Sequence, residues 1–129
     1  MEINEYQRMS NVAVQRHDSE KDAMAHWLLG LTEEAGEVSG LVKHKYFHNE
    51  PISVLSIAEE LGDVLWYIGA ICTTLGISLD DVAKANVAKL DIRFDREYGD
   101  NKVINRHEKD MIVRQVYEDI FINHKKEVK

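Results

Sequence analysis

The chain has 129 residues, the usual length of one domain, and 44% of them are hydrophobic, which is enough to form a core. The formal net charge of −7 at pH 7 argues against a nucleic acid polymer as the main partner, because proteins that bind its phosphate backbone are more often basic. The one cysteine, Cys72, cannot form an intramolecular disulfide, and we expect it to be a buried structural thiol. Its apolar run is far shorter than the ~20 residues that cross a bilayer, and residues 1–5 are acidic, so we expect a cytoplasmic protein with no membrane partner.

The spacing of apolar residues predicts five helices and no strand. The first helix covers residues 3–15. The second begins after Ser19, which pairs with Asp22 in a pattern similar to a capping box, and it ends near Phe47. Its apolar stripe consists of Trp27, Leu31, Ala35, Val38 and Val42.

The third helix begins at Pro51, because proline is tolerated in a first turn, and it ends before Gly76. Its inward-facing positions are Ile57, Leu61, Val64, Ile68 and Ile71. The fourth helix begins at Ser78, with Asp81 three residues further on, and it reaches about Tyr98.

The fifth helix, residues 107–124, carries an amphipathic stripe that must be buried somewhere. The stripe consists of Ile112, Val113, Val116, Tyr117, Ile120 and Phe121. This helix can dock on its own bundle or on a neighbouring subunit, and we favour the subunit interface. Because the connections between long helices are short, we expect an all-α antiparallel bundle of four core helices in residues 1–98, followed by a C-terminal helical extension in residues 99–129.

Two acidic clusters interrupt the apolar stripes of the second and third helices. Glu34 and Glu37 are three residues apart, as are Glu60 and Asp63, so each pair shares one helix face. One such cluster is more often a solvated surface, but two clusters at matching levels of antiparallel neighbours favour a site. Close carboxylates repel by about a kcal/mol or more per pair, and a divalent cation removes that cost. Without adjacent His or Cys, the expected ion is Mg²⁺ or Mn²⁺.

Three further features accompany these clusters. Gly36 and Gly62 lie inside them, where glycine weakens a helix, so we expect either a close backbone approach or room for a ligand. Tyr67 lies one turn after Asp63 on the same face and can stack on a base, although aromatic residues at helical spacing are more often core.

One face of the fourth helix carries polar side chains suited to phosphates. Asn86, Lys89 and Arg93 follow one another at spacings of three and four residues. Lysine binds a phosphate as a point charge and arginine binds it as a fork. The alternative interpretation is ordinary surface charge.

Three segments, in this order, resemble the motifs of MazG-like nucleotide pyrophosphohydrolases in the all-α NTP pyrophosphatase superfamily. They read GLTEEAGEV at residues 30–38, EELGDVLWY at residues 59–67 and NVAKLDIR at residues 86–93. The resemblance covers about residues 6–96. It implies hydrolysis of a nucleoside triphosphate between the α- and β-phosphates, giving nucleoside monophosphate and pyrophosphate.

The resemblance also implies residue roles. Glu34, Glu37, Glu60 and Asp63 match the family's metal ligands, and Glu33 matches a residue that orients or deprotonates the attacking water. Family members form homodimers or homotetramers, so the resemblance implies self-association.

Two alternatives to this function stay open. The first is a dUTPase-like enzyme or a phosphoribosyl-ATP pyrophosphohydrolase of the same superfamily. The second is a non-catalytic helical protein that binds nucleotide or a partner.

Overall fold

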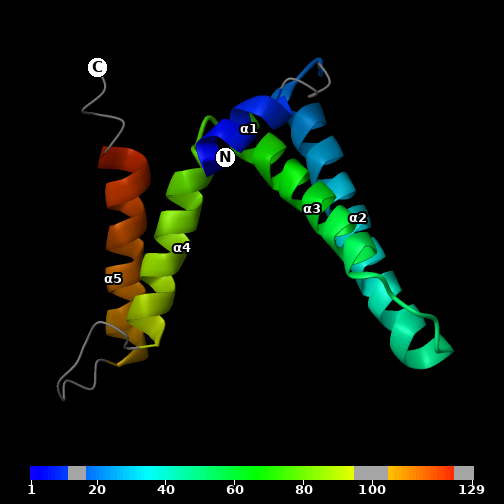
Figure 1. The fold of residues 1–129 in the computed structure, drawn as a ribbon. Coiled ribbons are helices and arrows are strands. Elements are labelled where there is room, and N and C mark those ends of the chain that lie inside the picture. Colours follow the sequence, from blue (N-terminus) through cyan, green and yellow to red (C-terminus); the bar gives the residue numbers. More distant parts are fainter. Residues whose placement is uncertain (12–16, 95–104, 124–129) are drawn as a thin grey trace. The chain divides into compact units, whose positions relative to one another are not determined.

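The computed structural model describes residues 1–11, 17–94 and 105–123, and every regular element in these ranges is a helix (Figure 1). The all-α prediction is therefore confirmed. The chain divides into two compact units, Met1–Leu79 and Asp80–Lys129. The elements are α1 (Ile3–Ser10), α2 (Glu20–His48), α3 (Val54–Thr74), α4 (Leu79–Arg93), α5 (Arg106–Glu118) and the π-helix η2 (Asp119–Asn123), which continues α5.

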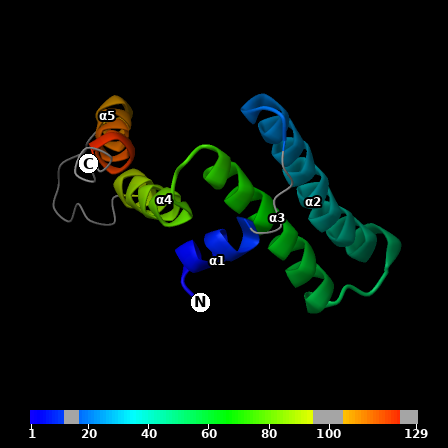
Figure 2. The same ribbon diagram turned by 90° about the horizontal axis from the view of Figure 1, so that it is seen from above.

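The first unit is built on a long helical hairpin. α2 and α3 run antiparallel and lie side by side in both views (Figures 1 and 2). The start of α2 is as predicted: the Ser19 side chain accepts a hydrogen bond of 3.1 Å from the backbone N–H of Asp22. The helix ends at His48. Its cap residue Asn49 has a left-handed φ of 56°, and the backbone N–H of Glu50 donates a hydrogen bond of 3.2 Å to the carbonyl of His44. The four-helix bundle itself stays a prediction.

The prediction that α3 begins at Pro51 is wrong. Ser53 caps the helix instead, because its hydroxyl accepts a hydrogen bond of 3.0 Å from the backbone N–H of Leu55. Pro51 therefore lies in the connection before the helix. The predicted stop at Gly76 is confirmed, since this glycine has a φ of 64° and directly follows the last turn.

The core of the first unit is centred on Trp27 of α2, which is only 1% exposed. It packs with Ala23 and Ala70, and its indole N–H donates a hydrogen bond of 3.0 Å to the hydroxyl of Thr74. Cys72 of α3 is 4% exposed, so the expected buried thiol is confirmed, and burial raises its pKa.

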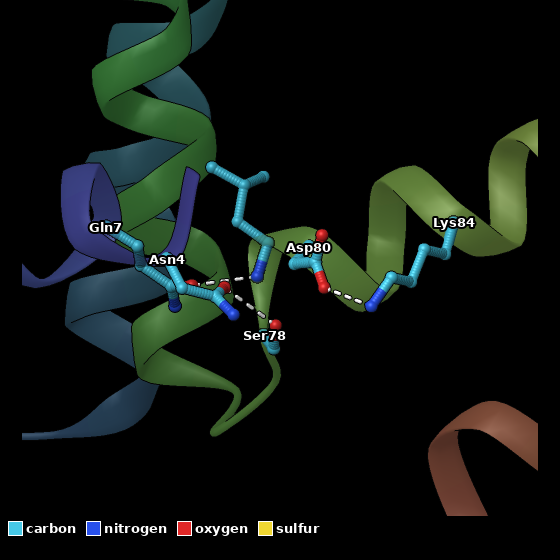
Figure 3. Close-up of polar contacts among 6 residues, drawn as sticks. Asn4, Gln7, Ser78, Asp80 and Lys84 are labelled. Carbon is cyan, nitrogen blue, oxygen red and sulfur yellow. Dashed lines mark hydrogen bonds and ion pairs between the residues drawn. The ribbon is translucent and has the colours of Figure 1, made fainter. Parts of the chain in front are cut away.

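α1 is held against α3 by polar contacts at the turn that follows α3 (Figure 3). Gln7 donates a hydrogen bond of 3.0 Å to the carbonyl of Ile77, and its side-chain oxygen accepts one of 2.7 Å from the N–H of Leu79. The hydroxyl of Ser78, predicted to open the fourth helix, donates to the side-chain oxygen of Asn4 at 2.9 Å. Gln7 thus satisfies a donor at the start of α4 that no local sequence pattern indicated.

In the second unit, α5 begins at a capping box that the sequence reading did not include. The side chain of Asn105 accepts from the N–H of Glu108, and the Glu108 carboxylate accepts from the N–H of Asn105, both at 3.0 Å. Ile112 and Val116 of α5 line a groove of about 550 Å³ together with residues of α4, so this part of the amphipathic stripe is partly covered within its own unit. α1 ends at Ser10 and α4 ends at Arg93, so the predicted ends near residues 15 and 98 are too far along the chain. The predicted end at residue 124 and the predicted domain boundary lie outside the described residues.

Many large apolar side chains of the hairpin are exposed, and this corrects the predicted stripes. Leu61 is 52% exposed and Val42 is 42% exposed, and Ala35 is exposed as well, although all three were expected inside. Periodicity identifies an apolar face, but one neighbouring helix covers only part of it. Among the described residues no single helix is long and apolar enough to cross a membrane, and only α3 and α4 taken together as a bent pair reach that length and composition.

Candidate metal centre

Three carboxylates from α2 and α3 meet at the middle of the hairpin. One oxygen from each of Glu34, Glu37 and Glu60 lies within 4.8 Å of the other two. Glu34 and Glu37 share a face of α2 because they are three residues apart, and the antiparallel α3 brings Glu60 to the same level. The structure therefore brings together three of the four side chains predicted to bind the metal.

The carboxylates of this trio are not compensated by positive charge. None of them forms an ion pair with any residue in the described part of the chain. Removal from water raises the pKa of Glu34, and the charges of Asp63, Glu37 and Glu60 raise it further. The pKa of Glu60 is raised for the same reasons, with Glu37 as the largest charge contribution. Such a cluster is chemically suited to a hard cation with oxygen ligands.

Asp63, the fourth predicted ligand, lies close enough for its charge to act on the trio. It raises the pKa of both Glu34 and Glu60, although it is not one of the three residues whose oxygens converge. Asp63 also acts on Tyr6 of α1, whose pKa is raised first by burial and then by this carboxylate. Tyr6 was missed by the sequence reading, because only the docking of α1 on α3 brings it near the site.

Tyr67 lies at the boundary between the carboxylates and the core. Its pKa is raised by burial and then by the charges of Glu34, Glu33 and Asp63. Its ring lies directly over the backbone of buried Gly30, where a Cβ would overlap the end of the ring, and it contacts the edge of Trp66 at a centroid distance of 4.9 Å. A side chain of α3 therefore approaches the backbone of α2 closely at Gly30.

The two glycines inside the acidic clusters have a different setting. A Cβ built on Gly36 or Gly62 would meet no atom within 4 Å, so the expectation of a close backbone approach is wrong for both. The other expectation, room for a ligand beside the carboxylates, stays a prediction. The one sequence signal for Gly30 is its spacing of four residues from Glu34, which places both on one face of α2. The contact with Tyr67 also depends on which α3 side chain lies opposite, and the sequence does not give this.

The remaining predicted site residues lie elsewhere on the helices. Glu33 is exposed on α2 next to Glu34, and its charge contributes to the raised pKa of Glu34 and of Tyr67. Asn86 and Arg93 are exposed on α4, and Lys89 is half-buried there. These three belong to the second unit, so their meeting with the carboxylates stays a prediction.

Comparison with known proteins gives two matches. A family model described as the MazG nucleotide pyrophosphohydrolase domain matches residues 23–96. A protein of Mycobacterium phage L5 called "Gene 37 protein" is 30% identical over 89 residues, which are 63% of this chain and 78% of that protein. No solved structure matches the chain significantly. The matched family region contains the carboxylates, Tyr67 and the three polar residues of α4, and it ends before α5.

Proposed function

The chain belongs to the MazG nucleotide pyrophosphohydrolase family, and we propose that it hydrolyses a nucleoside or deoxynucleoside triphosphate to the monophosphate and pyrophosphate in the presence of Mg²⁺. The observation that carries this proposal is the trio of Glu34, Glu37 and Glu60, whose oxygens lie within 4.8 Å of one another without a neighbouring cation in the described residues.

The side chains present fit a divalent metal. Glu34, Glu37 and Glu60 would hold it, and Asp63 would complete a set made only of oxygen donors, which suits Mg²⁺ and also Mn²⁺. When bound, such an ion would offset the charge of a polyphosphate and lower the pKa of a water molecule. The pKa values of Glu34 and Glu60 are raised first by removal from water and then by repulsion from neighbouring carboxylates, and a cation would relieve that repulsion.

Glu33 is proposed as the residue that accepts the proton of the attacking water. It adjoins a proposed metal ligand, and it remains exposed, so solvent can receive the proton afterwards. A carboxylate within hydrogen-bond reach of water can contribute about 10²–10⁴-fold to such a reaction as a general base. The attack is at the α-phosphorus, so the bond to the bridging oxygen breaks and pyrophosphate leaves.

Four side chains are proposed to contact the substrate. Lys89 and Arg93 bind phosphate oxygens, and Asn86 donates a further hydrogen bond from the same face of α4. Tyr67 is proposed to lie beside the base, because its ring adjoins the carboxylates as well as the core.

We also propose that a second copy of the chain covers the exposed apolar side chains of the hairpin, giving a homodimer or homotetramer. Leu28 and Leu29 of α2 are 49% and 73% exposed, and Leu61 and Leu65 of α3 are 52% and 37% exposed. Large exposed apolar side chains on both helices of one hairpin are typical of an interaction site.

The test is a panel of canonical and modified NTPs and dNTPs, assayed with Mg²⁺, with Mn²⁺ and with a chelator. We expect metal-dependent release of monophosphate and pyrophosphate. A preference for dUTP would favour the dUTPase-like alternative, and a preference for phosphoribosyl-ATP would favour the other enzyme of the superfamily. Orthophosphate as the first product would contradict the proposed bond choice, and no turnover on any substrate would favour the non-catalytic alternative.

A further inference from the structure

Among the described residues, a pocket at the start of α5 is lined by three basic side chains and one acidic side chain. These line a cavity of about 370 Å³: Arg93 from the end of α4, and Arg106, Lys109 and Asp110 from the first turns of α5. All four lie in the second unit. Arg106 and Lys109 follow the last residue of the family match, so the family does not account for them. We propose that this pocket binds the diphosphate group of a nucleotide or of pyrophosphate.

The pocket is held together by contacts between α4 and α5. The Arg93 guanidinium lies 3.9 Å from the Asp110 carboxylate, and the Lys109 ammonium donates a hydrogen bond of 3.4 Å to the Arg93 backbone carbonyl. These contacts fix the end of α4 beside the start of α5. Among the described lining residues, Asp110 pairs with Arg93, on a chain whose net charge is −7.

Arg106 is the side chain that remains available to a ligand. It forms no ion pair with any residue that the structure describes. The nearby Glu108 does not line the pocket, and its carboxylate already accepts a hydrogen bond of 3.0 Å from the backbone of Asn105. The partial positive charge at a helix N-terminus adds to the attraction of an anion to this corner.

The chemistry of the lining selects the class of ligand. Two guanidinium groups and one ammonium can contact several oxygens at once, which suits two linked phosphates better than a single carboxylate. The volume lies near the lower end of small-molecule sites, which hold about 300–1,000 Å³. The choice of a diphosphate over other anions rests on the proposed function, in which the substrate and one product both contain this group.

The test is titration of the full chain with sodium pyrophosphate in the presence of a chelator, by calorimetry and by NMR of the arginine side chains. Without metal the acidic cluster repels pyrophosphate, and Arg106→Ala separates binding in this pocket from binding at Asn86 and Lys89, which are also proposed to contact phosphates. We expect the signals of Arg93 and Arg106 to shift and Arg106→Ala to weaken binding about tenfold. Arg114→Ala is the matched control, because it removes the same charge from the same helix, where Arg114 pairs with Glu118 at 3.0 Å. This control should leave the affinity within about twofold.

A non-hydrolysable nucleoside triphosphate and a nucleoside monophosphate complete the experiment. Binding of pyrophosphate and of the triphosphate, with weaker binding of the monophosphate, supports the site. No binding of pyrophosphate, equal weakening by both variants, or monophosphate binding as tight as that of pyrophosphate would overturn it. Pyrophosphate binding without any turnover of nucleotides would contradict the proposed function alone. Turnover without pyrophosphate binding would contradict this site alone.

Discussion

The acidic centre of the first unit and the basic pocket of the second unit differ in how their charges are balanced. Glu34, Glu37 and Glu60 gather negative charge with no described partner, whereas Arg93 and Lys109 are each tied to a neighbour in the basic pocket. In the proposed function a cation would balance the acidic centre, whereas the contacts of Arg93 and Lys109 in the basic pocket form without an added ion.

The largest expected effect separates the two regions by their part in the reaction. Glu37→Gln removes one oxygen ligand from the trio and should lower the turnover number at least a hundredfold, because the bound metal supplies several kcal/mol to the transition state. Arg106→Ala should act mainly on substrate affinity, about tenfold. Steady-state kinetics over a range of triphosphate concentrations measures both effects, the first in kcat and the second in KM. Glu50→Gln, on the exposed loop after α2, is the control of equal charge change. Full activity of Glu37→Gln would show that the reaction does not need this carboxylate, and it would contradict the proposed metal centre.

A second prediction concerns stability rather than rate. Mg²⁺ should raise the thermal midpoint of the native chain by several degrees, because the ion binds the folded acidic centre and not the unfolded chain. In Glu60→Gln the rise should be much smaller, while Arg106→Ala should respond as the native chain does. Differential scanning calorimetry with and without Mg²⁺ measures the shifts. An equal rise in all three proteins would mean that the ion binds elsewhere.

A third prediction uses two glycines of α2 with opposite surroundings. Gly30→Ala places a Cβ against the ring of Tyr67 and should lower the free energy of unfolding by about 1 kcal/mol, after the helix propensity gained by alanine is subtracted. Gly40→Ala meets no atom within 4 Å and should raise it by roughly 0.5–1 kcal/mol. Urea denaturation measures both. If Gly30→Ala proves as stabilising as Gly40→Ala, the Tyr67 ring is not held over Gly30.

The most local expected effect tests whether the two units are independently stabilised. Asn105→Ala removes the capping box of α5 and should cost about 1 kcal/mol within the second unit. Ser53→Ala removes the cap of α3 and is the matched change in the first unit. Amide hydrogen exchange should become faster in α5 for the first variant and in α3 for the second. Faster exchange in both helices for either variant would show that the units unfold together.

Features set by neighbouring residues in the chain could be predicted from the sequence. The start of α2 depends on Ser19 and Asp22 alone, and the stop of α3 depends on the left-handed conformation of Gly76. The acidic trio was predictable because i, i+3 spacing places Glu34 and Glu37 on one face, and a hairpin brings the second helix to the same level.

Features set by packing between helices could not be predicted. The contact of Tyr67 with Gly30 depends on how far α3 slides along α2, and the position of Tyr6 depends on where α1 docks. Leu61 was expected inside because periodicity marks an apolar face without stating what covers it. Arg106 gave no sequence signal, because its pocket forms only where the end of α4 meets the start of α5.

The central claim, attack of water at the α-phosphorus, is tested most directly by hydrolysis in ¹⁸O-labelled water. The native chain would be incubated with Mg²⁺ and a triphosphate that it turns over, and the products would be separated and analysed by mass spectrometry. Attack at the α-phosphorus places one labelled oxygen in the nucleoside monophosphate and none in the pyrophosphate. Label in the pyrophosphate, or in orthophosphate formed together with a diphosphate, would contradict it.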